Sequence, residues 1–361
     1  MIGIKNMCVP EYTPIVISLI ILIILIKCKI TNPFWDKQPV MRSHLIREPS
    51  KSGIICKAPI FNIKLKSNQK ILLNNYSVTK IKLFLQNNFS NNYNTNNNYL
   101  DYILRKKHAV NISLLEDNKI IGFIHSSPIL VYIDEKLVKF KYVDYLCIDE
   151  KYRDNYMATI LIASIIKVEK RTQPIMFKKD YSRLPYQHFI SSNYYINDLR
   201  KLVPTVSKQI QELTPFNFYK YYAYTNKLLE RYHIKSLYTK REFFNLFLGK
   251  TLMNYIIVNN PNGNKTIIIG KKNIYRKDNI VLNCFEIDLI IGELRYLKSI
   301  NQELSNYLKL NGYNYICLAG IGSNIKFIKD NSYKKHSKVY YYTYNYCMPD
   351  IKASECVINI N

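Results

Sequence analysis

Residues 120–170 read IIGFIHSSPILVYIDEKLVKFKYVDYLCIDEKYRDNYMATILIASIIKVEK. Two short apolar runs, 120–125 and 129–133, are separated by Ser126-Ser127-Pro128, and a third run covers 137–148 after Asp134-Glu135. Turn residues between such runs predict a three-stranded meander. Apolar residues then recur at helical spacing, which predicts an amphipathic helix over 154–170. The stretch therefore predicts a meander, a loop and a helix, in that order.

The second half of the chain repeats this order. A hairpin signal, Pro261-Asn262-Gly263, lies between two apolar runs. The expected helices cover roughly 216–232, 240–248 and 291–310, and the expected strands cover 252–259, 265–270, 280–287, 313–318 and 339–346. Periodicity alone therefore predicts an α/β or α+β protein with mixed sheets.

The net charge of +26 is high for 361 residues. Such a charge is typical of proteins that bind nucleic acids or membrane surfaces. However, Lys, Asn, Ile and Tyr are all overused together, and their codons are rich in A and T, so genome composition explains the charge. No nucleic-acid-binding motif accompanies it. We therefore expect no nucleic-acid partner, and a basic nucleic-acid-binding protein stays an alternative interpretation.

The eight cysteines are scattered and form no C-x-x-C pair. Their spacing fits neither a zinc site nor a small disulfide scaffold. Free thiols are typical of a reducing compartment. We therefore expect a cytoplasmic protein without a metal site.

Residues 14–26 read PIVISLIILIILI and are almost wholly apolar. A helix of this length spans about 20 Å, less than the ~30 Å core of a bilayer. Flanking residues lengthen the segment to 12–29, because Lys27 and Lys29 can reach the interface with their charged ends. We expect an uncleaved anchor that leaves the main domain cytoplasmic. A buried core helix is the alternative.

Two motifs point to a known family. Residues 34–40 read Phe-Trp-Asp-Lys-Gln-Pro-Val and contain the only tryptophan of the chain, and residues 144–153 read DYLCIDEKYR and continue to Ala158. Together with Ile121-Gly122-Phe123-Ile124 and Pro128, they resemble the N-myristoyltransferases in order and spacing. The resemblance covers about residues 33–361. It implies two pseudo-symmetric halves like GCN5-related N-acyltransferases, with mixed sheets.

The resemblance also implies a domain organisation and an activity. The expected domains are an apolar anchor segment at 1–31, an acyl-CoA-binding half at 32–205 and a peptide-binding half at 206–361. The expected activity is transfer of a myristoyl group from myristoyl-CoA, the co-substrate, to the N-terminal glycine of peptides, by a monomer with no cofactor or metal. A catalytically impaired pseudoenzyme that binds acyl-CoA or acylated peptides is the alternative.

Specific residues carry these roles by resemblance. The backbone N–H groups of Tyr145 and Leu146 are expected to bind the thioester oxygen, and the C-terminal carboxylate of Asn361 is expected to be the catalytic base. The residues implied in acyl-CoA binding are Phe34, Trp35, Tyr145, Leu146, Cys147, Ile148, Arg153, Asp154, Tyr156, Met157 and Ala158.

The chain departs from the family in two loops. Where the family has Ser-Lys-Arg in the phosphate loop, this chain has Asp154-Asn155-Tyr156, so cations are lost and a carboxylate is gained. Lys151 and Arg153 keep their charge. The family's acidic, glycine-rich peptide loop aligns near residues 334–338, which read KKHSK. We therefore expect altered acyl-CoA binding and a preference for peptides with fewer lysines after the glycine. His188 keeps its family position and is expected to be structural.

Overall fold

The computed structural model describes residues 16, 18–20, 22, 34–41, 52–56, 63–89, 93–95, 97–153, 156–169, 172–206, 209–249, 252–277, 280–349 and 351–358. The chain forms two compact units, Met1–Gln38 and Pro39–Asn361. In the first unit, the described residues include a short 3-10 helix, η1 (Trp35–Lys37). No helix in the described part of the chain is long and apolar enough to cross a membrane. Most of the predicted anchor, 12–29, lies outside the described residues.

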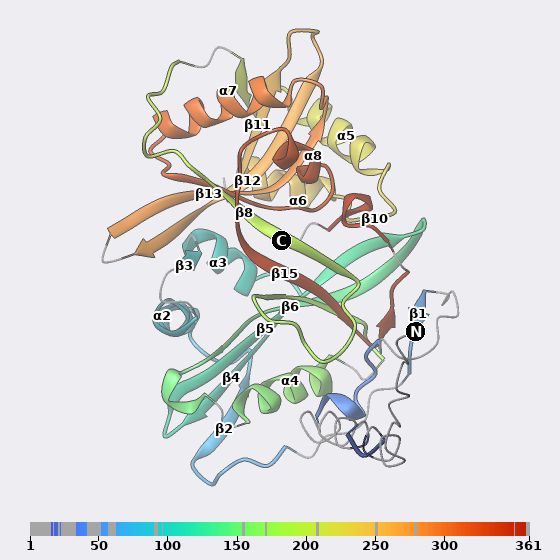
Figure 1. Ribbon diagram of the computed structural model, residues 1–361. Helices are drawn as coiled ribbons and strands as arrows, with labels where there is room; N and C mark the ends of the chain where they lie inside the picture. Colours follow the sequence, from blue (N-terminus) through green and yellow to red (C-terminus); the bar gives the residue numbers. More distant parts are fainter. Residues whose placement is uncertain are drawn as a thin grey trace, which may run out of the picture. The chain divides into compact units, whose positions relative to one another are not determined.

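The second unit is built on one large sheet (Figure 1). Its helices are α2 (Val78–Asn88), α3 (Asn97–Leu104), α4 (Met157–Val168), α5 (Phe218–Leu229), α6 (Lys240–Phe244), α7 (Leu297–Leu310) and α8 (Asn324–Lys329), with short turns of helix at η2 (Glu150–Tyr152), η3 (Asn245–Gly249) and η4 (Ala353–Glu355). Its strands are β1 (Gly53–Ile54), β2 (Gln69–Leu73), β3 (Tyr93–Thr95), β4 (Val110–Glu116), β5 (Lys119–Ile133), β6 (Lys136–Ile148), β7 (Ile175–Asp180), β8 (Ile190–Asp198), β9 (Ile210–Glu212), β10 (Ile234–Lys235), β11 (Asn254–Asn259), β12 (Lys265–Lys277), β13 (Ile280–Gly292), β14 (Tyr315–Ala319), β15 (Lys334–Tyr344), β16 (Tyr346–Cys347) and β17 (Cys356–Val357). Apart from the β1–β16 pair, the described strands belong to this sheet.

The two halves of the unit repeat one order of elements. In the first half, the antiparallel strands β4, β5 and β6 lead into α4 and then into β7, which pairs parallel to β6. In the second half, β11, β12 and β13 lead into α7 and then into β14, which pairs parallel to β13. A parallel neighbour needs such a helical crossover. The prediction of two pseudo-symmetric halves with mixed sheets is confirmed.

The halves exchange strands where they join. Strand β8 follows the first half in the chain but pairs with β14 of the second half. Strand β15 follows the second half but pairs with β7 of the first half. Because β8 and β15 also pair with each other, the sheet runs without a break through β7, β15, β8 and β14. Each half therefore contributes a strand next to the other half's own strands.

The structure contains a three-stranded meander, as predicted, but it consists of β4, β5 and β6, so the predicted position of its first strand is wrong. The break predicted at Ser126-Ser127-Pro128 is wrong, because these residues lie within the continuous strand β5. Pro128 is tolerated there because the pairing of β4 ends at Ser126, which leaves one side of β5 without that neighbour. The missed strand is β4, which joins β5 through a turn at Asp117 and Asn118, both with positive φ.

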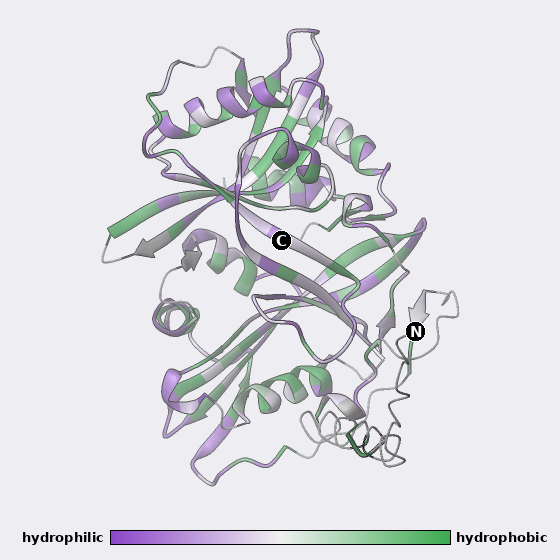
Figure 2. Ribbon diagram, in the orientation of Figure 1, coloured by the Kyte–Doolittle hydropathy of each residue, from purple (hydrophilic) through white to green (hydrophobic). Residues whose placement is uncertain are grey.

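Hydrophobic residues are concentrated in α4 and in parts of the central strands (Figure 2). Helix α4 is apolar along almost its whole length and packs on β4, β5 and β6. Helix α7 is amphipathic and buries Leu297, Ile300, Leu304 and Leu308, which follow the three-and-four spacing of a helix face. The hairpin predicted at Asn262-Gly263 joins β11 to β12, and Gly263 has a φ of 79° there.

Candidate active site

A β-bulge in strand β6 places Tyr145 and Leu146 together. The register between β5 and β6 shifts between Phe123 and His125, so one residue of β5 faces both Tyr145 and Leu146. Tyr145 has a φ of 54°, which is uncommon for a residue with a side chain. A bulge interrupts the ladder of backbone hydrogen bonds and re-aims the groups at that point. It can therefore direct backbone N–H groups away from the sheet.

The side chain next to this bulge is a carboxylate. The N–H of Tyr145 donates to Oδ1 of Asp144 at 2.7 Å. Burial raises the pKa of Asp144, while Lys178 and the bond from Tyr145 oppose that rise. The ring of Tyr145 is buried and lies 5.4 Å from the ring of Phe89. Asp144 therefore holds one of the two N–H groups expected to bind an oxyanion.

The second half carries a matching bulge. Ile269 pairs with Leu289 and Gly270 pairs with Ile287, so Asp288 is an extra residue on β13. Strand β13 is the counterpart of β6 in the repeated order of strands. A Cβ on Gly270 would lie 2.6 Å from the carbonyl oxygen of Glu286, so the two strands approach closely at this position. Both bulges thus interrupt the third strand of their half.

Charged side chains gather around the second bulge. The Nζ of Lys271 lies 3.3 Å from Asp288 Oδ1 and 3.8 Å from Glu286 Oε2. Burial lowers the pKa of Lys271, but Asp288, Tyr99 and Glu286 outweigh it and raise the pKa well above its ordinary value. Tyr194 donates to Glu286 Oε1 at 2.8 Å. Lys271 is therefore held as a cation between two carboxylates.

Tyr99 of α3 connects the two bulges. Lys271 Nζ lies 5.1 Å from the centre of the Tyr99 ring, a cation–π contact. Tyr99 and Tyr145 belong to the same buried hydrophobic cluster. Lys271 also opposes the rise that burial causes in the pKa of Asp144. The polar groups of the two halves therefore influence one another at this point of the sheet.

The other predicted residues follow the first bulge along the chain. Cys147 is buried, and burial raises the pKa of its thiol to about 12. Arg153 is exposed and donates through Nη2 to the carbonyl of Asn88 at 3.1 Å. Tyr156 precedes α4 with a left-handed φ of 58° and caps no backbone N–H with its side chain. Met157 and Ala158 begin α4, where the backbone N–H groups of the first turn have no partner within the helix. These groups lie close in sequence to the cation Arg153, and together they favour the binding of an anion.

The last described residues of the chain lie close to the same core. Strand β17 pairs in parallel with β10, and Cys356, Val357 and Ile358 are buried. Val357 belongs to the hydrophobic cluster that contains Tyr145. Asp154, Asn155 and Asn361 lie outside the described residues. Phe34 and Trp35 lie in the first unit, where their rings meet edge to face with centroids 4.9 Å apart.

Comparison with known proteins places these features in a family. Residues 63–178 match the family model "Myristoyl-CoA:protein N-myristoyltransferase, N-terminal domain", a span that includes the β6 bulge and α4. A protein of Amsacta moorei entomopoxvirus, provisionally named a glycylpeptide N-tetradecanoyltransferase, is 25% identical over 300 residues, which are 81% of this chain and 86% of the relative. Both matches support the N-myristoyltransferase family as the one this chain resembles.

Solved structures of the N-myristoyltransferase family share the fold. The N-myristoyltransferase of Saccharomyces cerevisiae, crystallised with bound myristoyl-CoA, superposes with a TM-score of 0.76 at 14% identity, covering 89% of this chain and 94% of the yeast chain. A second yeast structure with myristoyl-CoA gives a TM-score of 0.79 at 13% identity over 92% and 95% of the two chains. The fold is therefore shared across almost the whole of both proteins.

The segment aligned with the family's acidic peptide loop is basic here. It forms the first part of β15, where Lys334, Lys335, His336 and Lys338 are exposed. His188 packs edge to face on Tyr340 with ring centroids 5.1 Å apart. Burial lowers the pKa of His188, and its Nδ1 has no hydrogen-bond partner among the described residues. A neutral, packed histidine is consistent with the structural role expected for it.

Some residues of the site were not assigned from the sequence. The sequence motifs assign no role to Asp144, Lys271, Glu286 or Asp288. The signal was present, because Glu286 and Asp288 interrupt the apolar run 280–292. Charged residues inside a central strand are rare unless they are paired. No group of His, Cys, Asp and Glu in the described part of the chain is arranged to hold a metal ion.

Proposed function

We propose that this protein is a member of the N-myristoyltransferase family that transfers a myristoyl group from myristoyl-CoA to the N-terminal glycine of a peptide. The observation that carries the proposal is the β6 bulge at Tyr145 and Leu146, inside the segment that matches the family model. Backbone N–H groups at such a bulge suit the oxygen of a thioester as it becomes an oxyanion. One such donor is typically worth about 3–4 kcal/mol in the transition state.

The reaction is a direct acyl transfer. The neutral glycine amine attacks the thioester carbonyl carbon, a C–N bond forms, and the C–S bond breaks with loss of the CoA thiolate. The proton lost by the amine passes to a base, and the thiolate takes up a proton. Cys147 is not a suitable nucleophile for an acyl-enzyme route, because burial raises its pKa to about 12 and keeps it as a thiol.

We infer that the C-terminal carboxylate of Asn361 is the base. The burial of Cys356, Val357 and Ile358 supports this role, because the last described residues lie in the core rather than in solvent. An α-carboxylate has an ordinary pKa of about 3.3–3.7, and a buried site would raise it toward a useful value. Asn361 itself lies outside the described residues.

We further propose that acyl-CoA binds around the start of α4. Arg153 and the backbone N–H groups of Met157 and Ala158 at the start of the helix suit the phosphates, and Cys147 and Ile148 precede them at the end of β6. Burying a C14 chain contributes a gross ~10 kcal/mol. That energy offsets the cations missing from the phosphate loop. No metal or cofactor is required.

The remaining proposals concern organisation. We infer domains at 1–31, 32–205 and 206–361, a monomeric state, and membrane association of a cytoplasmic protein through residues 12–29. The apolar composition of 14–26 supports the association. Sedimentation with vesicles, comparing the full chain with one that lacks residues 1–31, tests it: the truncated chain should stay in the supernatant.

Mass spectrometry tests the activity. Incubation of the protein with myristoyl-CoA and a Gly-starting peptide should add one myristoyl group to the peptide's N-terminal amine and release CoA. The matched control is the same peptide with its glycine amine acetylated, which should stay unmodified. Failure to acylate any of a varied set of Gly-starting peptides, by protein that binds myristoyl-CoA, would contradict the proposal.

A further inference from the structure

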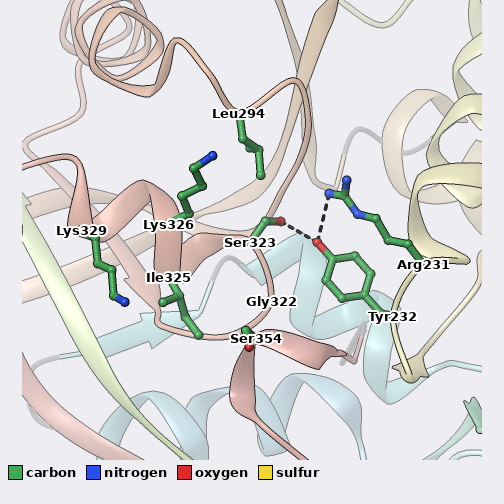
Figure 3. Close-up of a pocket in the computed structure, with 9 residues that line it drawn as sticks. All are labelled: Arg231, Tyr232, Leu294, Gly322, Ser323, Ile325, Lys326, Lys329 and Ser354. Carbon is green, nitrogen blue, oxygen red and sulfur yellow. Dashed lines mark hydrogen bonds between the residues drawn. The ribbon is translucent and has the colours of Figure 1, made fainter.

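A pocket of about 330 Å³ lies in the second half, away from the two bulges in sequence (Figure 3). Its wall comes from the turn after α5, the loop after β13, helix α8 and η4. The side chains of Leu294 and Ile325 and the ring of Tyr232 make part of this wall apolar. A volume of this size suits one or two side chains of a bound peptide.

The charged residues that line the pocket are all basic. They are Arg231, Lys326 and Lys329, and no acidic residue lines it. All three are exposed, and none forms an ion pair with another described residue. In Figure 3, Arg231 and Lys326 approach Leu294 from two sides. The pocket therefore combines an apolar wall with unpaired cations.

Hydroxyl groups hold one of these cations in place. Arg231 donates through Nη2 to the Tyr232 hydroxyl at 3.2 Å, and its guanidinium lies 5.2 Å from the Tyr232 ring centre. The Tyr232 hydroxyl also bonds Ser323 Oγ at 2.8 Å, and Ser323 donates to the carbonyl of Ile290. Tyr232 and Ser323 are buried. The guanidinium is therefore positioned by a fixed chain of hydrogen bonds rather than free in solvent.

The pocket adjoins the C-terminal strand. Gly322 has a φ of 53°, and a Cβ there would lie 2.6 Å from Val357 Cγ2. Val357 stands four residues before Asn361, and an extended chain of that length spans at most about 14 Å. A bound peptide advances about 3.3 Å per residue. About four residues after the glycine span that distance, so a residue near the fifth position can reach the pocket from an amine held at the C-terminal carboxylate.

We propose that this pocket binds an acidic side chain of the peptide substrate, a few residues after the N-terminal glycine. The inference rests on the proposed function, because that function places the glycine amine at the end of the chain. Glutamate fits the pocket's chemistry, since its methylene groups pack on Leu294 and Ile325 while its carboxylate meets Arg231 and Lys326. Specificity for acidic peptides would follow from these contacts and not only from the net charge.

Matched peptides test the proposal. Gly-starting peptides with a single Glu at each position from the third to the eighth are compared with the same peptides carrying Gln, by kcat/KM for acylation. At one or two adjacent positions, Glu should be preferred by about fivefold. The double variant Arg231→Gln with Lys326→Gln should remove that preference, with little change for the Gln peptides. The preference should also weaken as salt increases.

The control separates the pocket from the positive field of the whole protein. Lys220→Gln with Lys298→Gln removes the same charge from exposed residues of α5 and α7 that do not line the pocket. This control should keep the Glu preference. The pocket assignment would be overturned if the pocket variant and the control variant showed the same preference for Glu over Gln peptides. It would also be overturned if the unmodified protein acylated peptides but showed no such preference. If no peptide is acylated, the proposed function fails, and the pocket is judged by fluorescence anisotropy: labelled Glu peptides binding no better than Gln peptides would overturn it too.

Discussion

The backbone N–H of Tyr145 donates to the carboxylate of Asp144 at 2.7 Å, at the bulge where the N-myristoyltransferase family is expected to stabilise its oxyanion. The two residues are adjacent, and Tyr145 has a left-handed φ of 54° at this bulge. A bond to an ionised group is about twice as strong as a bond between neutral groups. If a thioester oxygen binds here as proposed, Asp144 competes with it for the same donor.

Replacing Asp144 by Asn should speed acyl transfer. The Asn oxygen still supports the bulge, but it holds the Tyr145 N–H less strongly and places no negative charge beside the developing oxyanion. We expect Asp144→Asn to raise kcat about tenfold, within the range that one oxyanion donor is worth. Single-turnover acylation with a saturating Gly peptide measures it. A fall in kcat would show that the carboxylate assists the reaction.

The same substitution should change stability with pH. Burial raises the folded-state pKa of Asp144 above its ordinary value, so its ionisation costs stability, and this loss grows as pH rises through the folded pKa. Asn carries no charge to desolvate. The difference between the thermal midpoint of Asp144→Asn and that of the unmodified protein should therefore increase in favour of the variant as pH rises from acid to neutral. Calorimetry measures both midpoints.

Lys271 should be important for stability. Lys271→Met removes one of the cations next to Glu286 and Asp288, in a region where Glu286 is buried, while Lys178 remains to interact with both carboxylates. Removing one partner of a buried ion pair lowers the free energy of unfolding by about 3–5 kcal/mol. Because Asp288 is partly exposed, we expect a loss near the lower end of that range. Urea unfolding measures the difference. The loss should shrink at acid pH, where the two carboxylates take up protons.

The neighbouring lysine provides the control for that measurement. Lys272 is exposed and next to Lys271 in β12, so its side chain points to the opposite face of the sheet. Lys272→Met should change stability by less than about 0.5 kcal/mol. Equal losses in the two variants would mean that the ion pairs around Lys271 contribute no more than a surface charge.

Local patterns predicted much of the fold but not the bulges. The helical spacing of Met157, Leu161 and Ile165 predicted α4, and Asn262-Gly263 predicted a hairpin. Pro128 was misread as a turn because its position in β5 depends on where β4 stops pairing. The extra residues at Tyr145 and Asp288 exist only relative to a partner strand. Sequence periodicity along one strand carries no information on such a register shift.

Extending the C-terminus should separate binding from turnover. Three added residues move the terminal carboxylate by up to about 10 Å and leave Asn361 with an amide carbonyl in its place. We expect acylation to fall about 100-fold or more, the typical contribution of a general base. Calorimetry should show myristoyl-CoA affinity unchanged within about twofold. The same three residues added at the N-terminus are the control, and full activity of the C-terminally extended chain would exclude Asn361 as the base.

The phosphate loop provides the last prediction. Asp154 stands where the family has serine, after the exposed cation Arg153 and before α4, whose N-cap residue Tyr156 makes no cap with its own side chain. A carboxylate near the phosphates of CoA repels them, and it also competes for the N–H groups of the helix. Asp154→Ser, combined with Asn155→Lys, should therefore tighten myristoyl-CoA binding by about threefold to fivefold, most clearly at low salt. Titration with acyl-CoA of several chain lengths should show the same gain for each, because the substitutions do not touch the acyl chain. Unchanged or weaker binding would mean that this loop does not contact CoA.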